Sequence, residues 1–218
     1  MSAGSMLAVA LSEKELGPRL PNQLSLAAVN APSATVISGE PQEVARIQQE
    51  LTDNGIETRL LRTSHAFHSH MMDPILDPFV ESVQKIDLKA PTIPFLSNVS
   101  GRWITADEAT DPYYWAKQMR ETVRFSSCIS ALAKGSDKIF LEVGPGKTLT
   151  TLSRRQAGKV GKHLFLSSLR NPQENTSDVA FVLNTLGRLW LSGIQPDWAA
   201  FHAASQPRRL QLPTYPFQ

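Results

Sequence analysis

The sequence of 218 residues has one cysteine and lacks long apolar runs. Because Cys128 has no second cysteine to pair with, an intrachain disulfide framework is excluded, as is usual for proteins of a reducing compartment. Every apolar stretch falls far short of the roughly 20 residues that a membrane span requires. Residues 1–10 also lack the basic and long apolar parts of a secretory signal. We therefore expect a cytoplasmic protein with no membrane partner.

An excess of charge of one sign is also missing. Lysine and arginine total 22 and aspartate and glutamate total 20, which gives a net charge of +2. There is no long basic run, and the helix-turn-helix and RNA-binding signatures are absent, so we expect no nucleic-acid partner. Hydrophobic residues make up 41% and charged residues 19% of the chain, which is ordinary for one large or two small globular domains.

The sequence also lacks the Gly-x-Ser-x-Gly elbow that exposes a nucleophilic serine. The thiol of Cys128 is no substitute, because it falls on the apolar stripe of a helix predicted over 125–132, where free cysteine usually acts as a small core residue. The segment 144–148, Gly-Pro-Gly-Lys-Thr, is not a phosphate-binding loop, because Leu141 stands where that pattern needs its first glycine. We interpret the segment as a tight turn from strand to helix.

The first sixty residues contain a regular pattern of strands and helices. Strands are predicted at 6–10, 24–29, 35–37 and 56–61, and helices at 13–20 and from Pro41 to Asn54-Gly55. Ser12 is suited to cap the first helix. In the second helix Val44, Ile47 and Leu51 follow the i, i+3, i+7 spacing of a buried stripe. The order βαββαβ is typical of a ferredoxin-like unit.

After residue 61 helical and strand patterns alternate, which indicates α/β layers. Helices are predicted at 71–85, 113–120, 125–132 and 147–155, and strands at 93–96 and 138–143. Residues 170–177 have the composition of a linker. A strongly amphipathic helix is predicted to follow, with one apolar face formed by Val179, Val182, Leu183, Leu186, Leu189 and Trp190.

The first candidate site is a cluster of three histidines, His65, His68 and His70. Imidazole is a good zinc ligand, but no nearby cysteine completes a zinc pattern. The same residues are compatible with solvent-facing positions at a helix start. They are also compatible with a general base, because the unperturbed histidine pKa of about 6.5 suits proton transfer at neutral pH. The residues alone leave these three interpretations open.

Six short motifs are spread over nearly the whole chain. In order they are Asn30-Ala31-Pro32 with Ser38-Gly39, then 65–69, 97–101, Tyr114-Trp115 with 123–125, 142–146 and 212–218. Each motif is modest, but six in this order are a strong signal. Together they resemble the acyltransferase domain of a modular type I polyketide synthase, of the malonyl-CoA:acyl carrier protein transacylase type. The chain is similar to its C-terminal part plus the post-acyltransferase linker.

The resemblance implies an α/β fold with three parts. Residues 1–62 would be the ferredoxin-like βαββαβ small subdomain, and residues 63–168 the C-terminal part of the α/β-hydrolase-like large acyltransferase subdomain. Residues 169–218 would be the helical post-acyltransferase linker. In this family the serine elbow, the N-terminal oxyanion donor and the arginine for the malonyl carboxylate belong to an N-terminal half that these residues do not contain.

The resemblance also implies a reaction, in which a malonyl extender unit moves from coenzyme A to the phosphopantetheine thiol of an acyl carrier protein. His68 matches the family's general base, and Gln118 matches the position whose backbone carbonyl orients it. In malonyl-selecting members His65, Ala66 and Phe67 precede the base, and the phenyl ring would fill the space that an α-methyl group needs. Asn30 is a candidate for the substrate channel. Malonyl-CoA is the implied substrate, and no metal or tightly bound cofactor is expected.

The implied partners are the acyl carrier protein and the adjacent ketosynthase and other synthase domains. Because the serine is missing, we expect the isolated chain to be an inactive fragment of the transferase. The alternative is a non-catalytic docking module for the carrier protein or ketosynthase. A stand-alone hydrolase with Ser69 as nucleophile is the weakest interpretation, since Ser69 lacks an elbow.

Overall fold

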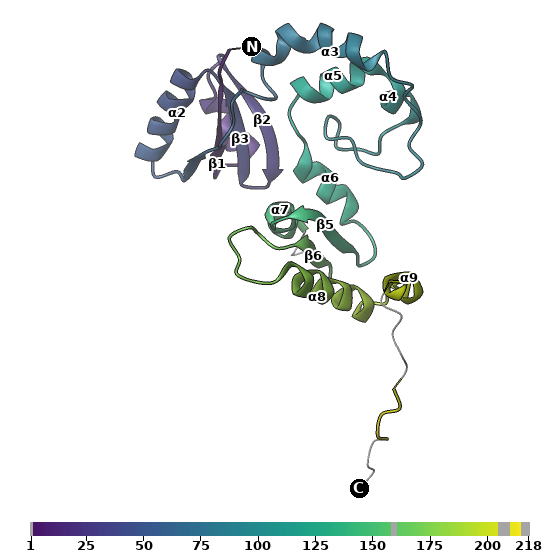
Figure 1. Cartoon of the computed structure of the whole chain (residues 1–218). Helices are drawn as coiled ribbons and strands as arrows, with labels where there is room; N and C mark the ends of the chain where they lie inside the picture. The colour runs from purple at the N-terminus through teal and green to yellow at the C-terminus, as the bar shows by residue number, and fades with distance from the viewer. Residues whose placement is uncertain (1, 158–160, 205–209, 215–218) are drawn as a thin grey trace. The chain divides into compact units, whose positions relative to one another are not determined.

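The computed structural model describes residues 2–157, 161–204 and 210–214 of an α/β protein (Figure 1). The chain divides into two compact units, Met1–Phe140 with Thr148–Phe165, and Leu141–Lys147 with Leu166–Gln218. The last four residues of the C-terminal motif predicted from the sequence, 215–218, lie outside the described residues.

The first unit begins with a four-stranded antiparallel sheet. Its strands are β1 (Ser5–Val9), β2 (Leu24–Ala31), β3 (Ala34–Gly39) and β4 (Thr58–Leu60), in the order β2-β3-β1-β4. The connection from β1 to β2 contains α1 (Glu13–Leu16) and η1 (Gly17–Arg19), and α2 (Pro41–Asp53) connects β3 to β4. The structure therefore has the βαββαβ order that the sequence pattern predicts.

One face of this sheet packs against α2 (Figure 1). Leu7 and Ile37, which are opposite each other in the β1–β3 register, are fully buried with Val44, Ile47 and Leu51 of α2. Each such side chain contributes roughly 1.5–3 kcal/mol of hydrophobic free energy. The predicted stripe of α2 is thus confirmed as core.

Local signals set the ends of both helices in this part of the chain. Ser12 and Glu15 form a reciprocal capping box at the start of α1. After α2, Gly55 adopts a φ of 76°, a conformation that glycine tolerates without strain. The first helix is shorter than predicted, because Gly17-Pro18 follows Leu16 and the chain continues as the 3₁₀ helix η1.

The next segment differs from the prediction in two places. The helix expected over 71–85 is η2 (His70–Ile75) followed by α3 (Leu76–Val83), with Pro74 inside η2. The strand expected at 93–96 is wrong. Only an isolated bridge joins Leu96 to Trp103 there, because prolines at 91 and 94 remove two backbone donors from a strand ladder.

The rest of the first unit is mainly helical. It contains α4 (Ala106–Thr110), α5 (Pro112–Arg120), α6 (Phe125–Leu132) and α7 (Thr148–Ala157). Cys128 is buried in α6, with its sulfur 3.4 Å from the Ser97 carbonyl oxygen, and burial raises the pKa of its thiol. The prediction of a core cysteine is confirmed. β5 (Ile139–Pro145) and β6 (Leu164–Leu169) form a two-stranded sheet that begins in this unit.

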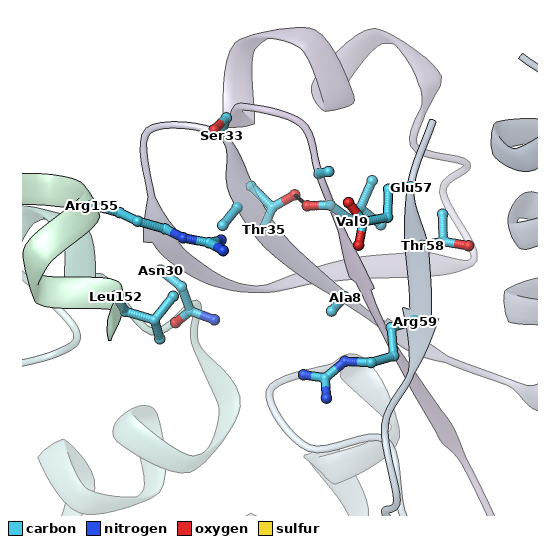
Figure 2. Close-up of a pocket in the computed structure, with 12 residues that line it drawn as sticks. Ala8, Val9, Asn30, Ser33, Thr35, Glu57, Thr58, Arg59, Leu152 and Arg155 are labelled. Atoms are coloured by element: carbon cyan, nitrogen blue, oxygen red, sulfur yellow. Dashed lines mark hydrogen bonds between the residues drawn. The ribbon is translucent and has the colours of Figure 1, made fainter. Parts of the chain in front are cut away.

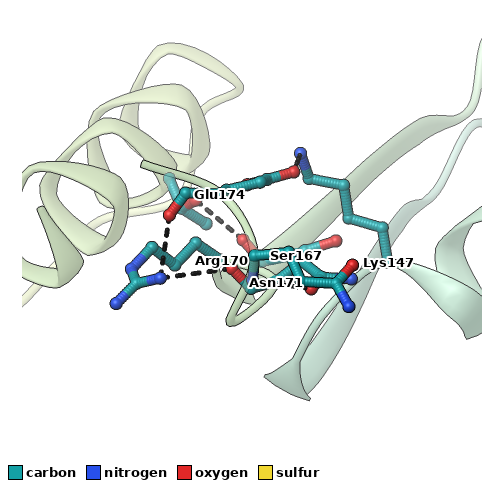
Figure 3. A network of polar contacts seen from close by, with 7 residues as sticks. Lys147, Ser167, Arg170, Asn171 and Glu174 are labelled. Atoms are coloured by element: carbon teal, nitrogen blue, oxygen red, sulfur yellow. Dashed lines mark hydrogen bonds and ion pairs between the residues drawn. The ribbon is translucent and has the colours of Figure 1, made fainter. Parts of the chain in front are cut away.

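The second unit contains α8 (Asp178–Leu191) and α9 (Trp198–His202). Its turn after β6 is held by polar contacts, among them Lys147 Nζ to Glu174 at 2.5 Å and Arg170 Nη1 to the Glu174 carbonyl at 2.8 Å (Figure 3). The turn predicted at 144–148 lies between β5, which ends at Pro145, and α7, which begins at Thr148. None of the helices in the described ranges is long and apolar enough to cross a membrane.

The buried stripe of α2 generates a stability prediction. Replacing Ile47 with alanine leaves a cavity beneath the sheet, and we expect the free energy of unfolding to fall by about 2–5 kcal/mol. Gln42→Ala, at an exposed position of the same helix, should change it by about 0.5 kcal/mol or less. Urea denaturation followed by circular dichroism measures both values. Equal effects of the two variants would contradict the assignment of the core.

Candidate functional site

His68 lies in the turn between β4 and η2, and its backbone conformation is unusual. Its φ of 59° makes it the non-glycine residue with positive φ in the described part of the chain, a conformation that is strained for a side chain other than Asn, Asp or His. The neighbouring Ser69 is fully buried. Its hydroxyl donates to the Ala66 carbonyl at 2.6 Å and accepts from the Met71 amide at 3.2 Å. These bonds hold the turn that carries His68.

The same turn packs closely against the start of the chain. The Gly4 amide donates to the Ser64 carbonyl at 3.3 Å. A Cβ atom on Gly4 would lie 2.4 Å from the Ala66 nitrogen and 2.6 Å from its Cβ. Only glycine therefore fits at this position, and Ala66 is fully buried beneath the turn. Ala66, which the family resemblance predicts to influence selectivity, is thus a packing position in this structure.

The imidazole of His68 is oriented by a backbone carbonyl. Its Nδ1 lies 3.0 Å from the Glu121 carbonyl oxygen. Since a carbonyl can only accept, Nδ1 carries the proton and Nε2 has a free lone pair in the neutral ring. Burial lowers the pKa of His68, and backbone hydrogen bonds with Glu121 and then Gln118 oppose that shift. The neutral ring can accept a proton through Nε2.

The acceptor nearest to His68 thus lies three residues beyond Gln118, the residue that the sequence indicates. Helix α5 ends at Arg120, and Glu121 is its C-cap residue. The carbonyls of the last helical turn lack partners within a helix. Those of Gln118 and Glu121 both act on His68, with Glu121 the stronger influence on its pKa. The hydrogen bond to His68 Nδ1 thus comes from Glu121, a neighbour that the motif does not identify, and the orienting role of Gln118 stays a prediction.

The other two histidines of the cluster take no part in the hydrogen bond between His68 and Glu121. His65 Nδ1 lies 2.8 Å from the Ser64 hydroxyl, and its ring centroid is 6.2 Å from that of Phe67. The Phe67 side chain is 41% exposed. His70 is exposed at the start of η2. In the described residues no three metal-ligating side chains of His, Cys, Asp or Glu come together.

A pocket of about 330 Å³ lies beside the sheet of the first unit. Its lining includes Asn30, Glu57 just before β4, Arg59 on β4 and Arg155 on α7. His68 does not line this pocket. The guanidinium ends of Arg59 and Arg155 extend toward the space between them (Figure 2). Both side chains are exposed, and neither has an ion pair with another described residue. Neither arginine is identified by a sequence motif, because only the fold brings positions 59 and 155 together.

Comparison with known proteins shows the class to which this chain belongs. The profile of the family described as "Acyl transferase domain" matches residues 1–196. The chain therefore belongs to the acyl transferase family. Its relatives within this family are acyltransferase domains of type I polyketide synthases.

The similarity extends over almost the whole chain. A phenolphthiocerol/phthiocerol polyketide synthase protein of Mycobacterium tuberculosis (strain CDC 1551 / Oshkosh) is 35% identical over 214 residues, which is 98% of this chain and 14% of that protein. The acyltransferase domain from the second module of the salinomycin polyketide synthase is 34% identical with a TM-score of 0.85, covering 98% of this chain and 50% of that domain. The acyltransferase domain of SpnD, in complex with 2-(pent-4-yn-1-yl)malonyl, is 38% identical with a TM-score of 0.83, covering 88% and 47%.

The environment of His68 predicts its titration. Because burial lowers its folded pKa, we expect an NMR midpoint below the unperturbed value of about 6.5. The sign for stability follows from proton binding. The unfolded chain binds the proton more readily, so the contribution of His68 is present above pH about 6.5 and is lost as the pH falls through the folded pKa.

The NMR signal of His68 can be assigned with the variant His68→Asn, since asparagine tolerates the left-handed backbone conformation. This variant should lose the shifted imidazole signal and the associated part of the pH dependence of stability. A His68 midpoint at or above 6.5 would show that burial does not control its pKa.

Proposed function

We propose that this chain supplies the general base and part of the substrate site of a malonyltransferase of a polyketide synthase. The reaction moves a malonyl unit from coenzyme A to the phosphopantetheine thiol of an acyl carrier protein. The observation that carries the proposal is the geometry of His68, whose Nδ1 is engaged by the Glu121 carbonyl at 3.0 Å. This bond leaves Nε2 available to a hydroxyl nucleophile.

The proton transfers follow from that geometry. A serine hydroxyl attacks the malonyl thioester while Nε2 of His68 takes its proton. The resulting imidazolium gives the proton to the departing coenzyme A thiolate, which leaves a malonyl-serine ester. In the second half His68 takes the proton of the phosphopantetheine thiol while its sulfur attacks the carbonyl of the malonyl-serine ester. The bond to the serine oxygen then breaks, and His68 returns the proton to that oxygen. The lowered pKa of His68 supports this cycle, because the ring begins it unprotonated.

The serine comes from a segment outside these 218 residues, which contain no Gly-x-Ser-x-Gly. Within them Ser69 is unsuited to the role, because it is fully buried and its hydroxyl already bonds Ala66 and Met71. The solved acyltransferase domains are about twice as long as the part that this chain matches, at 47% and 50% coverage. We infer that the isolated chain does not transfer acyl groups.

The pocket beside the sheet supports a substrate with phosphate groups. Arg59 and Arg155 supply two guanidinium groups and Glu57 one carboxylate, so these side chains together carry a charge of 2 − 1 = +1. Guanidinium groups bind phosphate oxygens through paired hydrogen bonds. Coenzyme A and phosphopantetheine share a phosphate-bearing pantetheine arm, and the amide of Asn30 lies in the same pocket. We assign the arm of both substrates to this pocket.

Selection of the malonyl unit is assigned to the residues before the base. Phe67 is adjacent to His68 and faces His65 at 6.2 Å between ring centroids, and its exposed ring is free to line a site completed by another segment. A rigid aromatic ring there would oppose an α-methyl substituent by steric overlap. The SpnD domain was solved with a substituted malonyl group, which supports the malonyl class of substrate.

The subdomain assignment follows the same proposal. The sheet order β2-β3-β1-β4 with its two crossing helices supports a ferredoxin-like small subdomain over residues 1–62. Residues 63–168 are then the returning part of the large subdomain, and 169–218 the post-acyltransferase linker. No cofactor other than the two substrates is required by this chemistry.

One observation favours the docking module as a second candidate. The apolar face predicted for α8 is largely exposed, with Val179 at 67%, Leu183 at 45% and Trp190 at 51%. Exposed apolar patches often mark surfaces that bind another protein. Carrier protein or ketosynthase is the implied partner of such a face. This role is compatible with the transferase, but it needs no contribution from His68.

The test of the function is reconstitution. The isolated chain incubated with malonyl-CoA should give no covalent adduct by mass spectrometry. Coexpression with a polypeptide carrying the Gly-His-Ser-x-Gly half should restore a malonyl-serine ester and transfer to an acyl carrier protein. His68→Asn in the reconstituted protein should reduce transfer by about 10²–10⁴-fold, the usual contribution of a general acid–base group.

Phe67→Ser serves as the matched variant beside the base. It should keep malonyl transfer and gain methylmalonyl transfer in a competition assay. A malonyl ester on the isolated chain, or full activity of reconstituted His68→Asn, would refute the proposal. Carrier-protein binding that survives without any transfer would favour the docking module.

The phosphate assignment has its own test. Arg59→Gln and Arg155→Gln should each weaken the affinity of the full chain for coenzyme A by about three- to tenfold, since each removes a partly exposed charge-assisted hydrogen bond. Isothermal titration calorimetry measures the change. Arg154→Gln is the control, because Arg154 adjoins the Phe165 ring at 5.8 Å and is not among the residues that line the pocket. Equal losses for all three variants would indicate general charge attraction instead.

A further inference from the structure

Residues 121–123 form a short extended segment along the free edge of β2. The Val123 amide donates to the Ala27 carbonyl at 2.9 Å, and the Val29 amide donates to the Val123 carbonyl at 2.9 Å. Ala28 and Val123 are a parallel bridge pair. The segment thus completes the outer edge of the sheet, although it comes from a part of the chain about 95 residues later, directly after α5.

The segment joins β2 where the strand is irregular. The β2–β3 register shifts between Leu26, which is opposite Ile37, and Ala28, which is opposite Val36. This shift places a bulge at Ala27, and bulges commonly occur where a strand re-aims neighbouring groups. At the bulge the Thr122 hydroxyl donates to the Leu26 carbonyl at 2.6 Å. Thr122 therefore makes the side-chain bond of a segment whose other bonds to β2 come from the backbone.

The residue before Thr122 is the one that orients His68. Glu121 is fixed on its other side by α5, because its backbone amide donates a hydrogen bond to the Lys117 carbonyl at 2.8 Å. Its own carbonyl oxygen accepts from His68 Nδ1 at 3.0 Å. The position of that oxygen thus depends on α5 behind it and on the attachment of Thr122 and Val123 to β2 ahead of it.

We propose that Thr122 is a positioning residue for His68. Its hydroxyl bond to Leu26 holds segment 121–123 against β2, which keeps the Glu121 carbonyl at Nδ1 and holds His68 in the tautomer with Nε2 unprotonated. The catalytic use of this tautomer rests on the function proposed above, whereas the effect of Thr122 on the tautomer does not. The Thr122 hydroxyl bonds Leu26 and not the ring of His68, so Thr122 acts through Glu121.

The test is the tautomer of His68 in the full chain, observed by ¹⁵N NMR of the imidazole nitrogens at a pH where the ring is neutral. His68→Asn identifies the signals among the five histidines. Thr122→Val keeps the shape of the side chain but cannot donate, and Thr122→Ser keeps the donor. We expect wild type and Thr122→Ser to be mainly Nδ1–H. In Thr122→Val the ratio of Nδ1–H to Nε2–H should fall about fivefold, the change expected when one intramolecular hydrogen bond is lost.

Thr122→Ala is a second hydroxyl-free variant, and we expect it to give the same change in the tautomer ratio. It serves as the test if Thr122→Val folds poorly. An unchanged ratio in the hydroxyl-free variants would overturn the proposal, as would a wild-type ring that is mainly Nε2–H. Unfolding of both hydroxyl-free variants, with Thr122→Ser folded, would also overturn it, because Thr122 would then stabilise the fold as a whole. None of these measurements requires acyl transfer, so failure of reconstitution and failure of this proposal are distinguishable.

Discussion

The hydrogen bond between His68 and the Glu121 carbonyl joins two segments that are 53 residues apart. Each end of this bond is held by the fold of the first unit. On one side Ser69 and Ala66 hold the turn that imposes a positive φ on His68. On the other side α5 and β2 hold segment 121–123. Because a hydrogen bond weakens steeply when its angle or distance changes, a small displacement of either segment would change the balance between the two ring tautomers.

This constraint accounts for residues that have no direct chemical role. Gly4 has no side chain because Ala66 occupies the space where a Cβ would lie. Asp73 of η2 forms an ion pair with Arg120, the last residue of α5, at 2.5 Å. That contact joins the two elements that flank the His68–Glu121 bond. Both side chains are partly exposed, so the pair adds little stability by itself. It does restrict how η2 and α5 move relative to each other.

Structure is predicted best from the sequence where interactions within one helix or strand determine it. The stripe Val44, Ile47 and Leu51 and the cap Ser12 follow from spacing and chemistry alone, because helix periodicity and capping are local. Asn30 and His68 are identified through motifs. The orienting role of Glu121 and the pairing of Arg59 with Arg155 in one pocket are not, because they depend on how distant elements pack. The strand expected at 93–96 is wrong because its apolar residues belong to a proline-interrupted loop.

The ring of His68 is oriented by residues of this chain alone, without the serine nucleophile of the proposed function. The contacts that orient His68 come from residues 4 to 123, all within the first unit. A serine elbow supplied by another segment would therefore meet an imidazole whose tautomer is already set. The proton-accepting lone pair does not have to be created by docking, and preorganisation of this kind reduces the reorganisation needed in the transition state. Under the proposed function, another segment would add the serine and the donors that stabilise the oxyanion, whereas the geometry of His68 is a property of this chain.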